Sequence, residues 1–137
     1  MHGLGRTIPA LPVADLEAAV EHYRSGFGFD AVHVGEGFAI VSREEARIHL
    51  WAATDESWRE RSDLRERPVT SGAESFLAGT ASCRIEVAEV DPLYDELAAA
   101  GVLHEASRDG VTETDFGTRE FACRDLDGNL IEFFRFS

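Results

Sequence analysis

Residues 118–136 read TREFACRDLDGNLIEFFRF, which is two β-rich runs separated by a short polar segment. Asp127-Gly128 between such runs is a strong hairpin signal, because both residues tolerate the backbone of a tight turn. The sequence therefore predicts a β-hairpin that joins a strand over 118–124 to a strand over 129–136.

Earlier parts of the chain have the same chemistry in the same order, which indicates an internal repeat. Three segments recur at offsets of 74 or 83 residues: 13–17 as 87–91, 38–39 as 121–122, and 48–51 as 131–134. We interpret the chain as two copies of one module, over about 7–52 and 81–136.

Each copy is predicted to form a strand, a helix and three further strands. In the first copy Asp15 is a suitable N-cap, followed by apolar residues at helical spacing. In the second copy Asp91 precedes Pro92 at the first helical position, and Gly101 ends the helix. The predicted fold class is α+β, with two β-α-β-β-β modules that form a curled mixed sheet around a groove.

Composition predicts one globular domain over residues 1–137, long enough to bury a core without a disulfide or metal. The 26 acidic and 13 basic residues give a net charge of −13, which disfavours nucleic acid as a partner. No apolar run approaches the ~20 residues of a membrane span, and residues 1–6 lack a signal-peptide core. We therefore expect a cytoplasmic protein without membrane contact, in which Cys83 and Cys123 are free and apolar in character.

The two copies are separated by a linker over residues 53–80. Its first part, from Glu56 to Arg67, is charged and helix-capable, and Pro68 ends it. Trp58 and Phe76 are unusual in a solvated linker, and connections of this length are often functional or disordered.

The repeat resembles the vicinal oxygen chelate superfamily, and within it the bleomycin-resistance proteins. The resemblance covers nearly the whole chain apart from residues 53–80. The segments that carry it are Ile8-Pro9-Ala10-Leu11, Asp15, Gly28-Phe29, Gly37-Phe38-Ala39, Leu93-Tyr94, Arg119-Glu120-Phe121-Ala122, Arg124-Asp125 and Asp127-Gly128-Asn129. The closing turn is common to the superfamily, whereas Arg119-Glu120-Phe121 together with Pro9 is more typical of the drug-binding branch.

The resemblance implies a groove in which the enzymes of the superfamily hold a divalent metal at four equivalent positions. In this chain those positions are Ile8, His49, Ser82 and Glu132. Isoleucine cannot bind a metal and serine is a rare ligand, whereas a catalytic site normally takes three protein ligands. His33 or His104 could be added only by departing from the family pattern. We therefore expect no metal, no cofactor and no enzymatic activity.

The same resemblance implies a ligand-binding groove lined by Phe38, His49, Trp51, Arg84, Phe116 and Glu132. Phe38 matches a ring that packs on the planar bithiazole of bleomycin, and strand alternation places Trp51 on the face of His49. Phe116 and Arg84 stand where the branch tends to have tryptophan, and a guanidinium can also stack on a planar ring. The alternatives are core packing for Phe38 and Trp51, and for Arg84 a salt bridge with Glu86 or Glu132.

Pro9 and Pro12 make the first strand unsuitable for a sheet centre. The resemblance implies that Pro9 is the hinge of an N-terminal arm exchanged between two subunits, in a homodimer whose two grooves are each lined by both chains. The alternative is a simple edge strand.

Three functions fit these observations. The leading hypothesis is an antibiotic-binding resistance protein that sequesters a bleomycin-type or other aromatic DNA-damaging natural product, such as an enediyne, without modifying it. The second is a metal-dependent enzyme of the same superfamily, namely a lyase, an extradiol dioxygenase or a thiol transferase that acts on a small molecule. The third is a small-molecule-responsive accessory protein without a role in resistance.

Overall fold

The computed structural model describes residues 2–53, 60, 62–63, 65–66, 68, 71–75 and 77–137. Trp58, Phe76 and much of the helix-capable segment over 56–67 lie outside the described residues.

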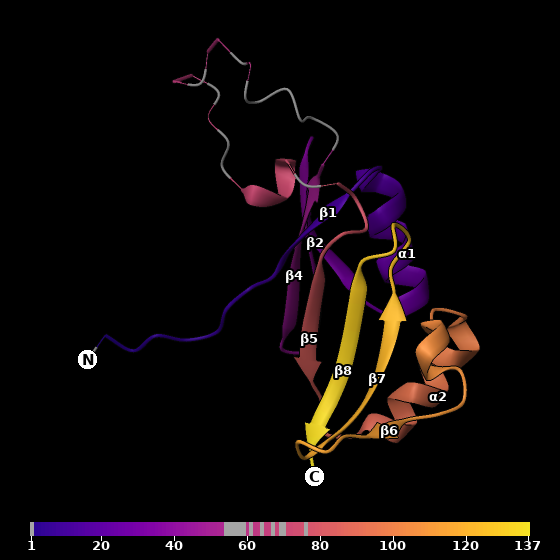
Figure 1. Ribbon diagram of the computed structural model, residues 1–137. Coiled ribbons are helices and arrows are strands. Elements are labelled where there is room, and N and C mark those ends of the chain that lie inside the picture. The colour runs from indigo at the N-terminus through magenta and orange to yellow at the C-terminus, as the bar shows by residue number, and fades with distance from the viewer. Residues whose placement is uncertain are drawn as a thin grey trace.

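The chain folds as two β-α-β-β-β modules, as the repeat predicts (Figure 1). The first module contains β1 (Ala10–Val13), α1 (Leu16–Phe27), β2 (Asp30–Val34), β3 (Phe38–Arg43) and β4 (Ala46–Ala52). The second contains β5 (Ser82–Glu86), α2 (Val90–Ala100), β6 (Thr112–Glu113), β7 (Thr118–Arg124) and β8 (Leu130–Phe136). Two short 3-10 helices, η2 (Gly72–Ser75) and η3 (Glu105–Ser107), complete the described elements.

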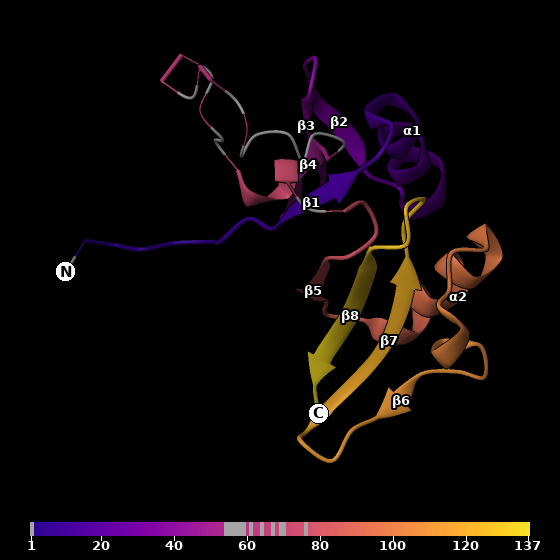
Figure 2. The same cartoon turned by 45° about the horizontal axis from the view of Figure 1, so that its top comes forward.

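Each module has its own four-stranded mixed sheet, in the order β1-β4-β3-β2 and β5-β8-β7-β6. The first strand of each module pairs in parallel with the last, and the other pairs are antiparallel. This confirms the predicted α+β class, with the mixed sheet present as two separate sheets (Figures 1 and 2). The strand β1 lies at a sheet edge, where Pro12 is tolerated because its missing N–H is not needed for an inner ladder.

The helix α1 begins and ends as its sequence predicts. The Asp15 carboxylate accepts a hydrogen bond of 3.1 Å from the backbone N–H of Ala18, which is the usual N-cap arrangement. Gly28 follows the helix with a φ of 73°, a backbone conformation that glycine adopts without strain.

The helix α2 begins earlier than the sequence predicts. Its first residue is Val90 with Glu89 as the N-cap, so Pro92 is the third helical residue and not the first. This is tolerated because the first four N–H groups of a helix have no intrahelical partner, and proline lacks only such a group. Gly101 ends the helix at a φ of 76°, as expected. Within the described ranges, no helix is both long enough and apolar enough to span a membrane.

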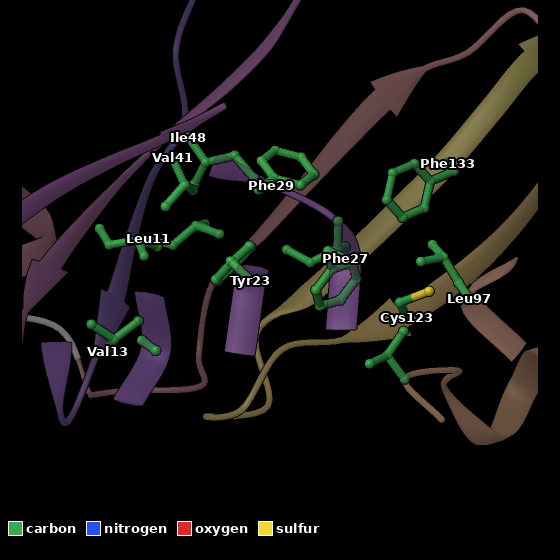
Figure 3. Packing of buried hydrophobic residues seen from close by; sticks show 14 of the residues in the cluster. Leu11, Val13, Tyr23, Phe27, Phe29, Val41, Ile48, Leu97, Cys123 and Phe133 are labelled. Atoms are coloured by element: carbon green, nitrogen blue, oxygen red, sulfur yellow. The ribbon is translucent and has the colours of Figure 1, made fainter. Parts of the chain in front are cut away.

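A single hydrophobic core extends through both modules (Figure 3). The Phe27 ring of α1 lies 5.3 Å from that of Tyr23 and 6.4 Å from that of Phe133 on β8, so aromatic contacts cross the boundary between modules. Cys83 and Cys123 are free and pair with the same β8 residue from opposite sides. Burial raises the pKa of each thiol to about 12, so both behave as small apolar groups, as predicted.

The turn after β7 connects the two modules through a buried hydrogen-bond network. One carboxylate oxygen of Asp125 accepts bonds from the Tyr23 hydroxyl (2.8 Å) and the Asn129 amide (2.9 Å). The Asn129 amide nitrogen also donates to the carbonyl of Pro12 (2.8 Å), and its oxygen accepts from the Ala81 N–H (3.1 Å). Because Tyr23 and Pro12 belong to the first module, these bonds hold the second module against it.

The chain packs tightly around the same turn. Gly79 has a φ of 85°, and a Cβ atom there would lie 2.2 Å from the carbonyl oxygen of Asp127. A side chain of Asp127 accepts a hydrogen bond of 2.9 Å from the N–H of Ala14 in the first module. Only glycine fits at position 79, since any other residue would push the turn away from its partners.

The Asn129→Ala substitution tests the role of this network in stability. The substitution leaves the partly buried Ala81 N–H and the buried Pro12 carbonyl without their partner, and each such loss costs about 1–3 kcal/mol. We therefore expect urea denaturation to show a free energy of unfolding lower by about 3 kcal/mol. The control Asp109→Ala changes an exposed turn residue and should stay within about 0.5 kcal/mol of the wild type. Equal stability of the two variants would contradict the role assigned to the network.

Candidate ligand site

The first candidate half-site is the outer face of the first sheet. Ala39, Val41, Ile48 and Leu50 alternate along β3 and β4 and are buried in the core beside α1. Phe38, His49 and Trp51 alternate with these buried residues along the strands and therefore face away from the core, as strand alternation predicts. The sheet thus presents three predicted site residues on one face.

These residues form an aromatic cluster, which we call half-site A. Phe38 pairs directly with Trp51 across the antiparallel strands, with ring centroids 4.6 Å apart. The His49 ring contacts the Phe38 ring edge-on, with centroids 5.0 Å apart. The centroid of the His33 ring on β2 lies 5.9 Å from that of the Phe38 ring. Burial, with a smaller effect of the Arg47 charge, lowers the pKa of His49, so its imidazole is neutral at pH 7.

The indole N–H of Trp51 is an unused donor in half-site A. Its nitrogen is buried and has no hydrogen-bond partner among the described residues. The short helix η2 packs on β1 and β4 beside it, with Ala73 buried in the contact. A buried N–H without a partner costs free energy, and a ligand acceptor placed there would remove that cost.

The outer face of the second sheet carries an ionic cluster, which we call half-site B. The Arg84 guanidinium bonds to Glu132 at 3.0 Å and to Glu120 at 2.7 Å. The same guanidinium carbon lies 4.6 Å from the centroid of the Phe134 ring. Arg84 therefore makes the predicted salt bridge with Glu132, with Glu120 as its second partner in place of Glu86, and is also stacked.

Glu120 was not among the predicted ligand-binding residues, although it stands in the Arg119-Glu120-Phe121 motif. The reason is the repeat offset. An offset of 83 relates Phe38 to Phe121, but Phe121 pairs with Phe133 in the core, whereas Phe38 pairs with Trp51 on the outer face.

The strand register gives the correct equivalence. Trp51 and Phe134 are 83 positions apart, and their cross-strand partners are Phe38 and Glu120. Likewise Ala10 pairs with His49 and Arg84 pairs with Glu132, at offsets of 74 and 83. Glu120 is therefore the counterpart of Phe38. A slip of one residue moves a side chain to the other face of the sheet, so the two phenylalanines have different environments.

Phe116 and Pro9 lie outside both clusters. Phe116 is 65% exposed in the turn between β6 and β7, beside Gly117, whose carbonyl accepts from the N–H of Ser137. The carbonyl of Pro9 accepts a hydrogen bond of 3.0 Å from the His49 N–H, so Pro9 is tied to the first sheet directly before β1. Residues 2–8 precede it as an extended arm that leads away from the domain (Figures 1 and 2).

The four positions that the resemblance relates to metal binding do not fit a divalent metal. Ile8 offers no donor, Ser82 has a hydroxyl that is a rare metal ligand, and Glu132 is engaged by Arg84. The alternative donor His104 accepts the Ala106 N–H through Nδ1. Over the described ranges, no three His, Cys, Asp or Glu side chains are grouped as a metal site.

A separate cavity of about 560 Å³ lies between the β3–β4 hairpin and the segment from β5 to α2. Its walls include Phe29, Ile85, Leu93 and Phe133, and an ion pair between Arg43 and Glu96 at 2.6 Å stands at its side. None of the six predicted ligand-binding residues lines this cavity. It therefore belongs to the junction of the modules and not to either half-site.

Comparison with known proteins places nearly the whole chain in one sequence family. Residues 4–133 match the family model described as the Glyoxalase/Bleomycin resistance protein/Dioxygenase superfamily. A bleomycin resistance protein of Geobacillus stearothermophilus is 47% identical over 130 residues, which covers 95% of this chain and 96% of that protein. A bleomycin resistance protein of Staphylococcus aureus matches to the same extent.

Solved structures share the fold along the whole chain. The bleomycin-binding protein of bleomycin-producing Streptomyces verticillus, solved with copper(II)-bleomycin, matches with a TM-score of 0.71 and 27% identity, covering 97% of each chain. A bleomycin resistance determinant encoded on the transposon Tn5 matches with a TM-score of 0.69 and 17% identity, covering 98% of this chain and 99% of that one. At that identity the second match shows the fold alone.

The different environments of Phe38 and Phe121 predict different costs of truncation. Phe121→Ala leaves a cavity in the core and should lower the free energy of unfolding by about 3–5 kcal/mol. Phe38→Ala removes a half-buried ring from the outer face, and its expected cost is about 1–2 kcal/mol. Urea denaturation of both variants measures the difference, and equal costs would show that Phe38 is an ordinary core residue.

Proposed function

The chain belongs to the Glyoxalase/Bleomycin resistance protein/Dioxygenase superfamily, and from this premise we propose that it binds a bleomycin-type antibiotic and holds it without modifying it. The observation that carries the proposal is the near-complete match to proteins named bleomycin resistance proteins. The match covers 95% of this chain, and the family model spans residues 4–133.

The geometry of half-site A supports recognition of a planar ring system. The Phe38 and Trp51 rings are held against each other by their strand pairing, so little side-chain freedom is lost when a ligand ring packs on them. Each well-placed ring pair contributes about 0.5–1.5 kcal/mol beyond the burial of its area. The neutral His49 and the Trp51 N–H would add polar contacts at the edge of the same surface.

The donor chemistry supports binding over turnover. Of the four metal-equivalent positions, only His49 and Glu132 have side chains that readily bind a metal, and Glu132 is already paired. Resistance would then follow from mass action, since drug held by the protein is not free to reach its target. We place this binding in the cytoplasm, where the two free cysteines are stable as thiols.

We further propose that the protein acts as a homodimer in which each groove combines half-site A of one copy with half-site B of the other. Both half-sites are outer sheet faces that the described part of a single chain leaves partly exposed. The arm over residues 2–8 supports the proposal, because Leu4 is 99% exposed and Ile8 is also exposed. Pro9 would be the hinge from which this arm reaches the partner, and a two-fold arrangement closes after two copies.

Stoichiometric protection tests the binding proposal. DNA cleavage by bleomycin should be suppressed until the drug exceeds the number of binding sites and should then proceed as without protein. Drug released from the complex by denaturation should have an unchanged mass. Protection that continues far beyond the number of sites, together with a drug of altered mass, would show catalytic turnover instead.

Deletion of residues 2–8 tests the dimer. We expect the full chain to elute as a dimer by light scattering at micromolar concentration, and the truncated chain to dissociate at least tenfold more readily. The matched control is Arg6→Ala, which removes the exposed ion pair and the backbone hydrogen bond that Arg6 makes to Glu45 of the same chain, and it should leave the dimer intact. A full-length monomer at micromolar concentration would contradict the shared groove.

A further inference from the structure

The two half-sites occupy equivalent places on the repeated fold but differ in chemistry. Phe38 of half-site A corresponds to Glu120 of half-site B, and Trp51 corresponds to Phe134. Half-site B therefore retains one ring of the pair and has a carboxylate in place of the other. The position of Arg84 corresponds to Ala10, whose small side chain fills none of this space in half-site A.

The Arg84 guanidinium covers the ring that half-site B retains. Its central carbon lies 4.6 Å from the Phe134 ring centroid, which is a stacking distance for a planar cation. The Arg84 side chain is 37% exposed, so the guanidinium is open to solvent while it is held against the ring. Half-site B thus has a guanidinium stacked on the Phe134 ring, at the place where half-site A has two rings in contact.

The Glu120 side chain is held in place by Thr118 as well as by Arg84. Only 16% of its side chain is exposed, and one carboxylate oxygen accepts bonds from both the Thr118 hydroxyl (2.8 Å) and Arg84 (2.7 Å). Thr118 is buried and shares a hydrogen bond of 2.7 Å with the Thr114 hydroxyl. The Arg84 bond and, secondarily, the Thr118 bond lower the pKa of Glu120, which stays ionised at neutral pH.

We propose that Glu120 is a positioning residue that holds the Arg84 guanidinium flat over Phe134, and that this guanidinium serves as the second stacking surface of the drug site. The inference rests on the proposed function, since it assigns a role within the same groove. Two carboxylates from adjacent strands, Glu120 and Glu132, grip the guanidinium from different directions and restrict its rotation. A ligand ring then meets a preorganised plane and not a mobile side chain.

This arrangement defines the class of ligand that half-site B selects. A guanidinium attracts the electron-rich face of a planar ring, so neutral heteroaromatic rings are favoured over cationic ones. Because two carboxylates face one arginine, the cluster retains net negative charge, and a cationic group elsewhere on the ligand is not repelled. The preferred ligand is therefore a neutral heteroaromatic ring system that carries a cationic substituent.

Arg84→Lys and Glu120→Gln test the proposal with metal-free bleomycin as the probe in calorimetric titrations. Lysine keeps the charge and both carboxylate partners but has no flat surface, so we expect about three- to tenfold weaker binding. Glu120→Gln leaves the guanidinium with Glu132 as its one carboxylate partner and should weaken binding to a similar extent. In the Arg84→Lys background, Glu120→Gln should have no further effect, because no plane is left to position.

Glu17→Gln is the matched control. It makes the same change of charge at an exposed position of α1, outside both half-sites, and should bind bleomycin as the wild type does. Urea denaturation of each variant separates loss of binding from loss of fold, and Arg84→Lys alone decides the question if Glu120→Gln does not fold. If Arg84→Lys bound bleomycin with wild-type affinity, the role of Arg84 and Glu120 would be overturned and the proposed function would stand. The same would follow if the two losses of affinity were additive in the double variant. Failure of the wild type to bind bleomycin would overturn the proposed function and this inference together.

Discussion

The buried hydrogen-bond network around Asp125 and Asn129 is the constraint on which the rest of the structure depends. Each module buries only one face of its sheet, and the network fixes how the two modules meet. It connects the Tyr23 hydroxyl and the Pro12 carbonyl of the first module to the turn between β7 and β8 of the second. Since all of these groups are buried, separating the modules would leave several polar atoms without partners, which is costly. The orientation of both outer sheet faces follows from this joint.

The two modules share one fold, but their outer sheet faces differ in chemistry. Half-site A is a contact between rings, whereas half-site B is a guanidinium held on a ring by two carboxylates. Both surfaces are flat, and both are kept rigid by cross-strand pairing. In the proposed dimer, a groove lined by one surface of each kind would distinguish the two faces of a bound ring. The repeat explains the common geometry, and the departures from the repeat at Arg84 and Glu120 would supply the proposed selectivity.

Much of this fold could be predicted because its signals are local. The Asp127-Gly128 turn, the Asp15 cap and the alternation of β4 each depend on a few neighbouring residues, and each is present as predicted. The predicted first residue of α2 lay two residues after the observed one, because proline is accepted anywhere in the first turn of a helix. Glu120 was missed because the register between β7 and β8 is set by packing of the whole sheet. Aligning the chain with itself does not reveal such a one-residue shift, although the shift decides which side chain lies on the outer face of the sheet.

In the proposed dimer, one groove takes half-site A from one copy and half-site B from its partner. The most direct measurement mixes the Phe38→Ala and Arg84→Ala proteins, lets the subunits exchange, and counts tight bleomycin sites by titration. If the groove is shared, each mixed dimer has one groove with both substitutions and one with neither. One site of wild-type affinity should therefore reappear per mixed dimer, although neither variant binds tightly alone. If each groove is instead formed within one chain, every site in the mixture keeps one substitution, and no tight binding is restored.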